Sequence, residues 1–211
     1  MQAAEAKAMA KITEIKQQVK RADRFSIYVD GKYSFSLSQE ELAKSGLHKD
    51  QELSAQELKQ IHKTAVLDKA KDRVMRYISI RPRSQWEIED YLKRKGYNPR
   101  VTRTVRVTLK RAGLIDDLAF ARQWVEWRIN FKNRSKRQIK SELFKKRISR
   151  DIIDEVLAEV GDDTELDQIK QVIERKSKLS QYADKQKLIA YLARQGFPYP
   201  LIKKALNTEE N

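Results

Sequence analysis

The sequence predicts a mainly α-helical protein, in which three tandem three-helix repeats form an elongated curved rod behind a small N-terminal β-hairpin extension. Three observations predict this class. One short helical pattern occurs three times along the chain. Only 6 of the 211 residues are glycine and 36% are charged, which favours helices. A stretch that alternates apolar and polar residues, as a strand does, lies near the N-terminus.

The N-terminal extension, residues 1–62, differs in kind from the rest of the chain. The segment RFSIYVDGKYSFSLS alternates around Asp30-Gly31, a preferred two-residue hairpin turn. We expect a hairpin here, joined by a strand near residues 12–19. Two Ser-x-x-Glu capping boxes follow, the first beginning a short helix that ends at Gly46 and the second, at Ser54, beginning the long helix into the first repeat.

The repeated helix is written SQWEIEDYLKRKGY at residues 84–97, SKRQIKSELFKKRI at 135–148 and DKQKLIAYLARQGF at 184–197. Each copy places two apolar residues four positions apart on one face, and Ser84, Ser135 and Asp184 are N-cap types. Gly96 and Gly196 can end their helices in the left-handed conformation. Because Arg147 stands at the equivalent position, we expect the middle copy to close differently.

Each copy lies between two further helical patterns. A longer apolar period precedes it, at roughly residues 63–80, 117–131 and 164–179, and a shorter one follows it, with Asn98 and Ser149 as expected caps. A unit of about 50 residues is marginal alone, so neighbouring units should share apolar surface. We therefore expect repeats at residues 63–115, 116–162 and 163–211.

The composition excludes several kinds of site. The chain has no cysteine and only two histidines, His48 and His62, which we expect in a loop and on a helix surface, so no zinc site is predicted. Asp116-Asp117 is more simply a helix cap than a magnesium site. We expect no catalytic residue, metal or cofactor. No signal-peptide core and no membrane-length apolar run is present, so we expect a cytoplasmic protein.

Positive charge is concentrated in the middle of the chain. Lys plus Arg against Asp plus Glu number 15 and 11 in residues 1–80, 21 and 7 in 81–150, and 9 and 12 in 151–211. A solvated face is the alternative interpretation, but a local excess of 14 costs self-repulsion, so we favour a polyanionic partner.

One helix shows how the cations are arranged. Around residues 101–112, Arg103, Arg106 and Lys110 fall at about 140–200° from Val101, opposite the apolar positions. The other candidate partner-binding cations are Arg81, Arg83, Lys93, Arg94, Lys95, Lys132, Arg134, Lys136, Arg137 and Lys140. Cations at a helix start, as in residues 132–140, oppose the helix dipole, which favours a role in binding.

Phe120, Trp124, Trp127 and Phe131 recur at helical spacing. This stripe could stack on unpaired bases, but we expect it to be the buried face of its helix. For Trp86, core and interface positions stay open.

The segments RPRSQWEIEDYLKRKGY (81–97), GLIDDLAFARQWVEWRI (113–129) and RSKRQIKSELFKKRI (134–148) resemble the RecX family of bacterial recombination regulators. The family's acidic pair, Phe and Ala are matched by Asp116, Asp117, Phe120 and Ala121, and its next pattern by Ile139, Glu142, Leu143 and Ile148. The sequence departs at Lys146-Arg147 and at Asn133, where the family often has glycine, so the local turns there are expected to differ.

The resemblance implies a non-catalytic regulator of recombination, DNA repair and the SOS response. Such a protein binds the RecA filament on single-stranded DNA, lies along its groove, and inhibits extension, ATP hydrolysis and strand exchange. Double-stranded DNA stays open as a further partner, no membrane is expected, and a monomer is expected. A general nucleic-acid-binding module, or a scaffold for an acidic protein, is the alternative.

Overall fold

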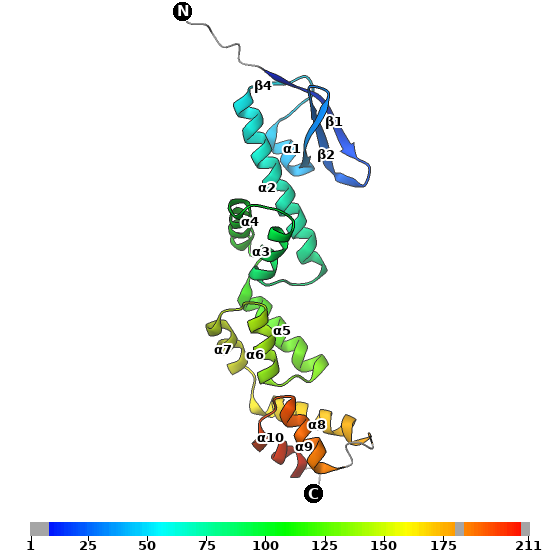
Figure 1. Cartoon of the computed structure of the whole chain (residues 1–211), viewed down its shortest axis with the longest axis vertical. Helices are drawn as coiled ribbons and strands as arrows, with labels where there is room; N and C mark the ends of the chain where they lie inside the picture. Colours follow the sequence, from blue (N-terminus) through cyan, green and yellow to red (C-terminus); the bar gives the residue numbers. More distant parts are fainter. Residues whose placement is uncertain (1–8, 180–183, 208–211) are drawn as a thin grey trace, which may run out of the picture. The chain divides into compact units, whose positions relative to one another are not determined.

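The computed structural model describes residues 9–179 and 184–207 (Figure 1). The chain divides into two compact units. The first contains the residues up to Pro82 together with Ile88–Ala112, and the second contains Arg83–Glu87 together with the residues from Gly113 onward. The fold is mainly helical, and the outermost residues of the first and last predicted domains lie outside the described ranges.

A four-stranded antiparallel sheet begins the first unit. Its strands are β1 (Ala10–Gln18), β2 (Arg21–Val29), β3 (Lys32–Ser38) and β4 (Glu52–Leu53), in the order β3-β2-β1-β4. The predicted hairpin is β2–β3, and its turn residues Asp30 and Gly31 both have positive φ, 49° and 76°. The predicted additional strand is β1. The short strand β4 was not predicted, because two residues carry no readable alternation.

The two predicted capping signals both begin helices. Ser38 caps α1 (Gln39–Ser45), which ends at Gly46 in the left-handed conformation. Ser54 and Glu57 form the complete capping box of α2 (Ala55–Ile80). This 26-residue helix contacts β3 and β4 of the sheet and also α4 (Pro99–Arg111) of the first repeat. Helix α2 therefore packs against both the sheet and the first three-helix repeat.

A buried ion pair joins the sheet to α2. Arg24 of β2 is only 3% exposed, and its guanidinium donates to Asp68 at 3.0 Å, to Asp72 at 3.1 Å and to the Ser36 carbonyl at 3.1 Å. Asp68 also accepts from the backbone N–H of Ser38 at 2.9 Å. Because every charged group is paired, the desolvation cost is offset, and the network specifies how the sheet lies on the helix.

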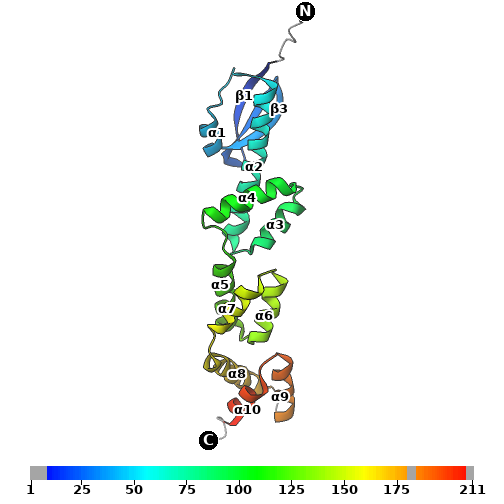
Figure 2. The ribbon, with the colours of Figure 1, turned by 90° about the vertical axis from the view of Figure 1, so that its left-hand side faces the viewer.

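The second unit contains two complete three-helix repeats. The second repeat consists of α5 (Asp117–Lys132), α6 (Lys136–Lys145) and α7 (Arg150–Ala158), and the third of α8 (Asp162–Ser177), α9 (Lys185–Arg194) and α10 (Tyr199–Asn207). Each has its own apolar core, around Ile139 and Leu143 in one and Leu188 and Leu192 in the other. Figure 2 shows both sets of helices. The predicted i, i+4 pairs are buried.

The three copies of the repeated helix close in the same way, so the expectation of a different closure in the middle copy was wrong. After α3 (Gln85–Arg94), the N–H of Tyr97 donates to the Leu92 carbonyl at 3.1 Å, and Ile148 donates to Leu143 and Phe197 to Leu192, both at 3.2 Å. Arg147 takes a φ of 57°, beside 81° for Gly96 and 86° for Gly196. Arg147 therefore adopts the left-handed conformation that glycine adopts at the same position in the other two copies. Asn133, which stands where the family often has glycine, also adopts the left-handed conformation, with φ 46°.

A pair of hydrogen bonds at the start of a repeated helix occurs twice in the second unit. Ser135 is fully buried, and its Oγ donates to the carbonyl of Gln195, the residue that follows α9, at 2.6 Å. The N–H of Lys136 donates to Glu165 of α8 at 3.1 Å. In the same manner Ser84 Oγ donates to the Lys146 carbonyl at 2.9 Å, and the Gln85 N–H donates to Asp117 at 2.8 Å.

These serines do more than cap a helix. Ser135 and Ser84 each also accept from an N–H three residues on, at 3.3 Å, as predicted, so one hydroxyl satisfies two neighbouring segments. Asn98 and Asp184 also cap as predicted. Ser149 stands at its expected N-cap position but makes no side-chain cap hydrogen bond.

Candidate nucleic-acid interface

The predicted cation stripe of α4 lies on the exposed side of the helix, opposite the buried Val105 and Leu109. Arg103 and Lys110 are exposed and form no ion pair with any described residue. Arg106 is half-buried and donates to Glu89 at 2.9 Å. Two of the three predicted cations are therefore free to meet a partner, and the third already has an intramolecular one.

The predicted cations around α3 also include some with an intramolecular contact and some without an ion pair to a described residue. Arg94 pairs with Asp90 one turn earlier, and the Lys95 ammonium lies 5.7 Å from the centre of the Tyr91 ring. Lys93 is exposed and has no ion pair among the described residues. Arg81 ends α2 and donates to the Pro82 carbonyl. Arg83 is half-buried before α3.

Of three further predicted cations in the second unit, two have structural roles. Lys132 lies 5.5 Å from the ring centre of Trp127. Lys136 belongs to the contact with α8, through its N–H on Glu165 and through an ion pair with Asp162 at 3.2 Å. Arg134 is half-buried, and its Nε has no hydrogen-bond partner among the described residues.

Arg137 and Lys140 line an open groove of about 630 Å³. The other lining residues are Trp86, Ser141, Phe144, Lys145 and Arg147. Sequence reasoning did not single out the lining residues Phe144, Lys145 and Arg147. Their signal was present, because Phe144 and Lys145 follow Arg137 at i+7 and i+8 on one helical face. The position of Trp86, which the sequence left open, is on the surface.

The aromatic stripe of α5 is only partly buried, so the expectation of a buried face was half wrong. Phe120 is buried and Trp124 half-buried, but Trp127 is 43% and Phe131 70% exposed. Arg128 covers part of the stripe, with its guanidinium carbon 4.5 Å from the Trp124 ring and 4.8 Å from the Trp127 ring.

The acidic pair at the start of α5 is structural, as predicted. Asp116 caps the helix by accepting from the N–H groups of Leu118 and Ala119, at 2.8 and 3.1 Å. Asp117 accepts from Gln85. No group of three or more metal-ligand side chains occurs among the described residues. His48 lies in a loop as expected, but His62 faces the sheet, where it shares a 2.9 Å hydrogen bond with Ser34.

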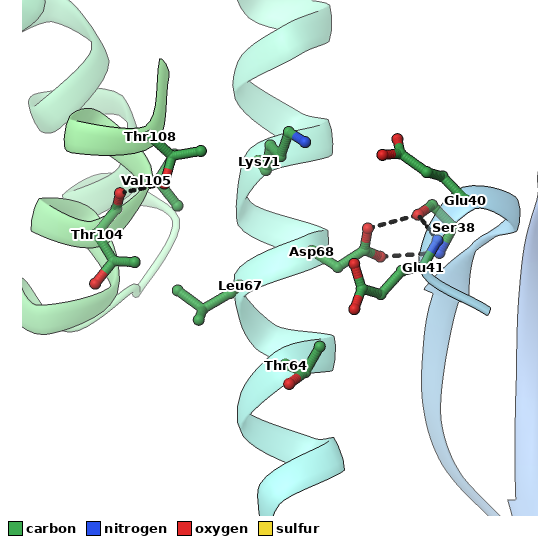
Figure 3. Close-up of a pocket in the computed structure, with 10 residues that line it drawn as sticks. All are labelled: Ser38, Glu40, Glu41, Thr64, Leu67, Asp68, Lys71, Thr104, Val105 and Thr108. Carbon is green, nitrogen blue, oxygen red and sulfur yellow. Dashed lines mark hydrogen bonds between the residues drawn. The ribbon is translucent and has the colours of Figure 1, made fainter. Parts of the chain in front are cut away.

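A second hollow lies in the first unit, between α1, α2 and α4 (Figure 3). Its volume is about 220 Å³, and its most buried acid, Asp68, is already engaged by Ser38 and Arg24. Glu40 at its edge pairs with Lys44. Because its central carboxylate is already satisfied, this hollow offers little for a ligand to bind.

No helix in the described ranges is both long and apolar enough to cross a lipid bilayer.

Fold and charge together define a tandem three-helix-repeat protein that displays cations on the solvent faces of α4 and α6. Family descriptions match along its length: the RecX N-terminal domain at residues 10–54, and the first, second and third RecX three-helix domains at 70–105, 116–157 and 163–206. The chain belongs to the RecX family of regulatory proteins.

Relatives named regulatory protein RecX cover most of the chain. The one from Listeria monocytogenes is 31% identical over 92% of this chain and 74% of its own, and the one from Clostridioides difficile is 30% identical over 94% and 95%. A crystal structure of regulatory protein RecX, 28% identical, superposes with a TM-score of 0.68 over 92% of this chain and 99% of its own. RecX from Lactobacillus salivarius, 22% identical with a TM-score of 0.60, shares the fold.

Proposed function

We propose that the protein regulates homologous recombination and DNA repair without a reaction of its own. It binds the RecA filament on single-stranded DNA along the filament groove and inhibits extension, ATP hydrolysis and strand exchange. Membership of a family of regulatory proteins supports this proposal. The observation that carries it is a pair of exposed cations on α4, Arg103 and Lys110, which face solvent and have no ion pair within the described ranges.

The filament presents two kinds of negative group, the phosphates of the enclosed strand and acidic side chains of its protein. An exposed lysine or arginine with no internal partner loses no ion pair when it meets either group, so its whole attraction is available for binding. Arg106 is different, because a partner would have to replace Glu89. Of the three predicted cations of α4, we therefore propose Arg103 and Lys110 as the residues that contact the partner.

The test is the ATPase rate of RecA preassembled on single-stranded DNA, with this protein added well below one molecule per RecA protomer. The double variant Arg103→Glu/Lys110→Glu loses two attractions and adds two repulsions of about 0.5 kcal/mol each, so the inhibitory concentration should rise roughly tenfold to thirtyfold. Lys203→Glu is the matched control, because Lys203 occupies the Arg103 position in the third repeat, 100 residues later, in a segment with a negative net charge.

Three outcomes would count against the proposal. Absence of inhibition by the wild type beyond what occupancy of bare DNA explains would reduce the protein to a general nucleic-acid-binding module. An unchanged inhibitory concentration for the double variant would remove α4 from the interface. An effect of Lys203→Glu as large as that of the single variant Arg103→Glu, which changes the net charge by the same amount, would show that only total charge matters.

A further inference from the structure

We propose that the groove between Trp86 and α6 binds unpaired nucleotides of single-stranded DNA, with bases stacked on Trp86 and Phe144 and phosphates held by Arg137, Lys145 and Arg147. This inference rests on the proposed function and deepens it, since it names the ligand and the residues by which the second unit would meet the DNA. The groove's volume of about 630 Å³ is in the range of natural ligand sites.

The groove has two well-defined walls. One is the solvent face of α6, where Arg137, Ser141, Phe144 and Lys145 lie opposite the buried Ile139 and Leu143. The other is Trp86. Of the two residues before it, Ser84 donates from its Oγ to the carbonyl of Lys146 just after α6, and Gln85 donates from its N–H to Asp117 at the start of α5. These two hydrogen bonds hold the backbone that carries Trp86 before any ligand arrives, which lowers the entropic cost of binding.

The chemistry of the groove matches a single strand. None of the described residues that line it is acidic, and Arg137, Lys145 and Arg147 form no ion pair within the described chain. Trp86 is 41% and Phe144 44% exposed, so both rings can be reached from solvent. Cations beside aromatic rings are the usual composition of single-strand sites, because every base has a face that stacks.

Two other anionic partners fit less well. The bases of a duplex are already stacked on each other, so they cannot cover Trp86 and Phe144. An acidic peptide would use the cations but would leave both rings without a partner.

The backbone at Arg147 supports a role in binding. Its φ of 57° lies in the left-handed region, and the equivalent residues of the other two copies are Gly96 and Gly196. The backbone hydrogen bonds of this turn are the same in all three copies, so the fold does not require arginine there. Glycine at this position would relieve the backbone strain, so the presence of arginine indicates a function for its side chain. Because the side chain of Arg147 lines the groove, we assign it a role in binding there.

The test is the binding of a fluorescently labelled fifteen-nucleotide oligo(dT) to the full chain, followed by anisotropy at several salt concentrations. Trp86→Ala and Phe144→Ala should each weaken binding about 5- to 100-fold, and Trp86→Phe should restore most of the loss. Arg147→Gly should reduce the salt slope by about 0.7, the value for one phosphate on a single strand. This variant keeps the turn, since glycine is the residue at both equivalent positions.

Two controls separate stacking from charge and from misfolding. Tyr199→Ala removes an aromatic ring that is 52% exposed in the third repeat, and its binding should be unchanged. An abasic oligonucleotide of equal length carries the phosphates without bases, so Trp86→Ala should have no effect on its weaker binding.

The inference is overturned if the wild type does not bind oligo(dT), if Trp86→Ala and Phe144→Ala bind like the wild type, or if a poly-glutamate peptide displaces the oligonucleotide at equal charge. The outcome of the RecA ATPase assay is independent of these binding measurements. A wild type that binds oligo(dT) through Trp86 but does not inhibit the filament would refute the proposed function and leave this site standing.

Discussion

Gly196→Ala should destabilise the third repeat more than Gly96→Ala destabilises the first. Both glycines end the same helix of their repeat with nearly equal φ, 86° and 81°. Either alanine pays the left-handed penalty of about 1–2 kcal/mol. At Gly96 a new Cβ would meet no atom within 4 Å, whereas at Gly196 it would lie 2.9 Å from Ser135 Oγ and 3.1 Å from Arg137 Cβ.

The extra cost at Gly196 arises because Ser135 cannot yield freely. It is fully buried, donates to the Gln195 carbonyl and accepts from Gln138. Displacing its hydroxyl loses a hydrogen bond worth about 1 kcal/mol, and overpacking adds about 1–3 kcal/mol. We therefore expect a loss of about 3–6 kcal/mol for Gly196→Ala, against about 1–2 kcal/mol for Gly96→Ala.

Hydrogen exchange of the amides of α8 and α10 measures this difference locally, without assuming that the whole chain unfolds in one step. In Gly196→Ala these amides should exchange faster by the factor that the extra 2–4 kcal/mol implies, roughly 30- to 800-fold. Equal protection losses in the two variants, each measured in its own repeat, would mean that Ser135 does not hold the end of α9 closely, and the reasoning would be wrong.

Three further changes test other parts of the structure. Arg147→Gly should raise the free energy of unfolding by up to about 1 kcal/mol, because relief of the left-handed strain exceeds the entropy cost of glycine; a lower urea midpoint for the second repeat would contradict this. Arg24→Met should cost about 3–5 kcal/mol by leaving the buried carboxylate of Asp68 without its cation, while Asp72 keeps its ion pairs with Arg21 and Arg76; Arg21→Met, at a side chain 27% exposed, should cost less than about 1 kcal/mol in the same thermal melt. Burial raises the pKa of Glu165, which the N–H of Lys136 only partly offsets, so the folded state holds this proton more tightly than the unfolded chain does. The resulting stability is complete below the ordinary value of 4.5 and is lost as pH rises through the folded-state pKa; Glu165→Gln should flatten that part of the pH profile of the urea midpoint, and an unchanged profile would show that Glu165 does not titrate there.

Much of the fold follows from local patterns. The i, i+4 pairs such as Ile88 and Leu92, the caps at Ser54 and Asn98, and the Asp30-Gly31 turn act over a few residues, so their spacing alone predicts helices and a hairpin. The prediction of the helix end at residue 147 was wrong because it relied only on the general preference of glycine over arginine for the left-handed conformation. Arg147 was expected to change the helix end, but a left-handed arginine costs only about 1–2 kcal/mol, which the hydrogen bonds and packing of the turn offset.

The sequence by itself determined the helical repeats, the N-terminal hairpin and the concentration of cations in the middle of the chain, because helical period, turn chemistry and charge are local properties. Only the tertiary structure decided which cations are free. Arg106 pairs with Glu89 and Lys136 with Asp162, partners 17 and 26 residues away, whereas Arg137 and Arg147 lie beside Trp86 and form no ion pair with any residue that the structure describes. Ion pairing and grooves depend on contacts between residues distant in the chain, and no local pattern contains that information.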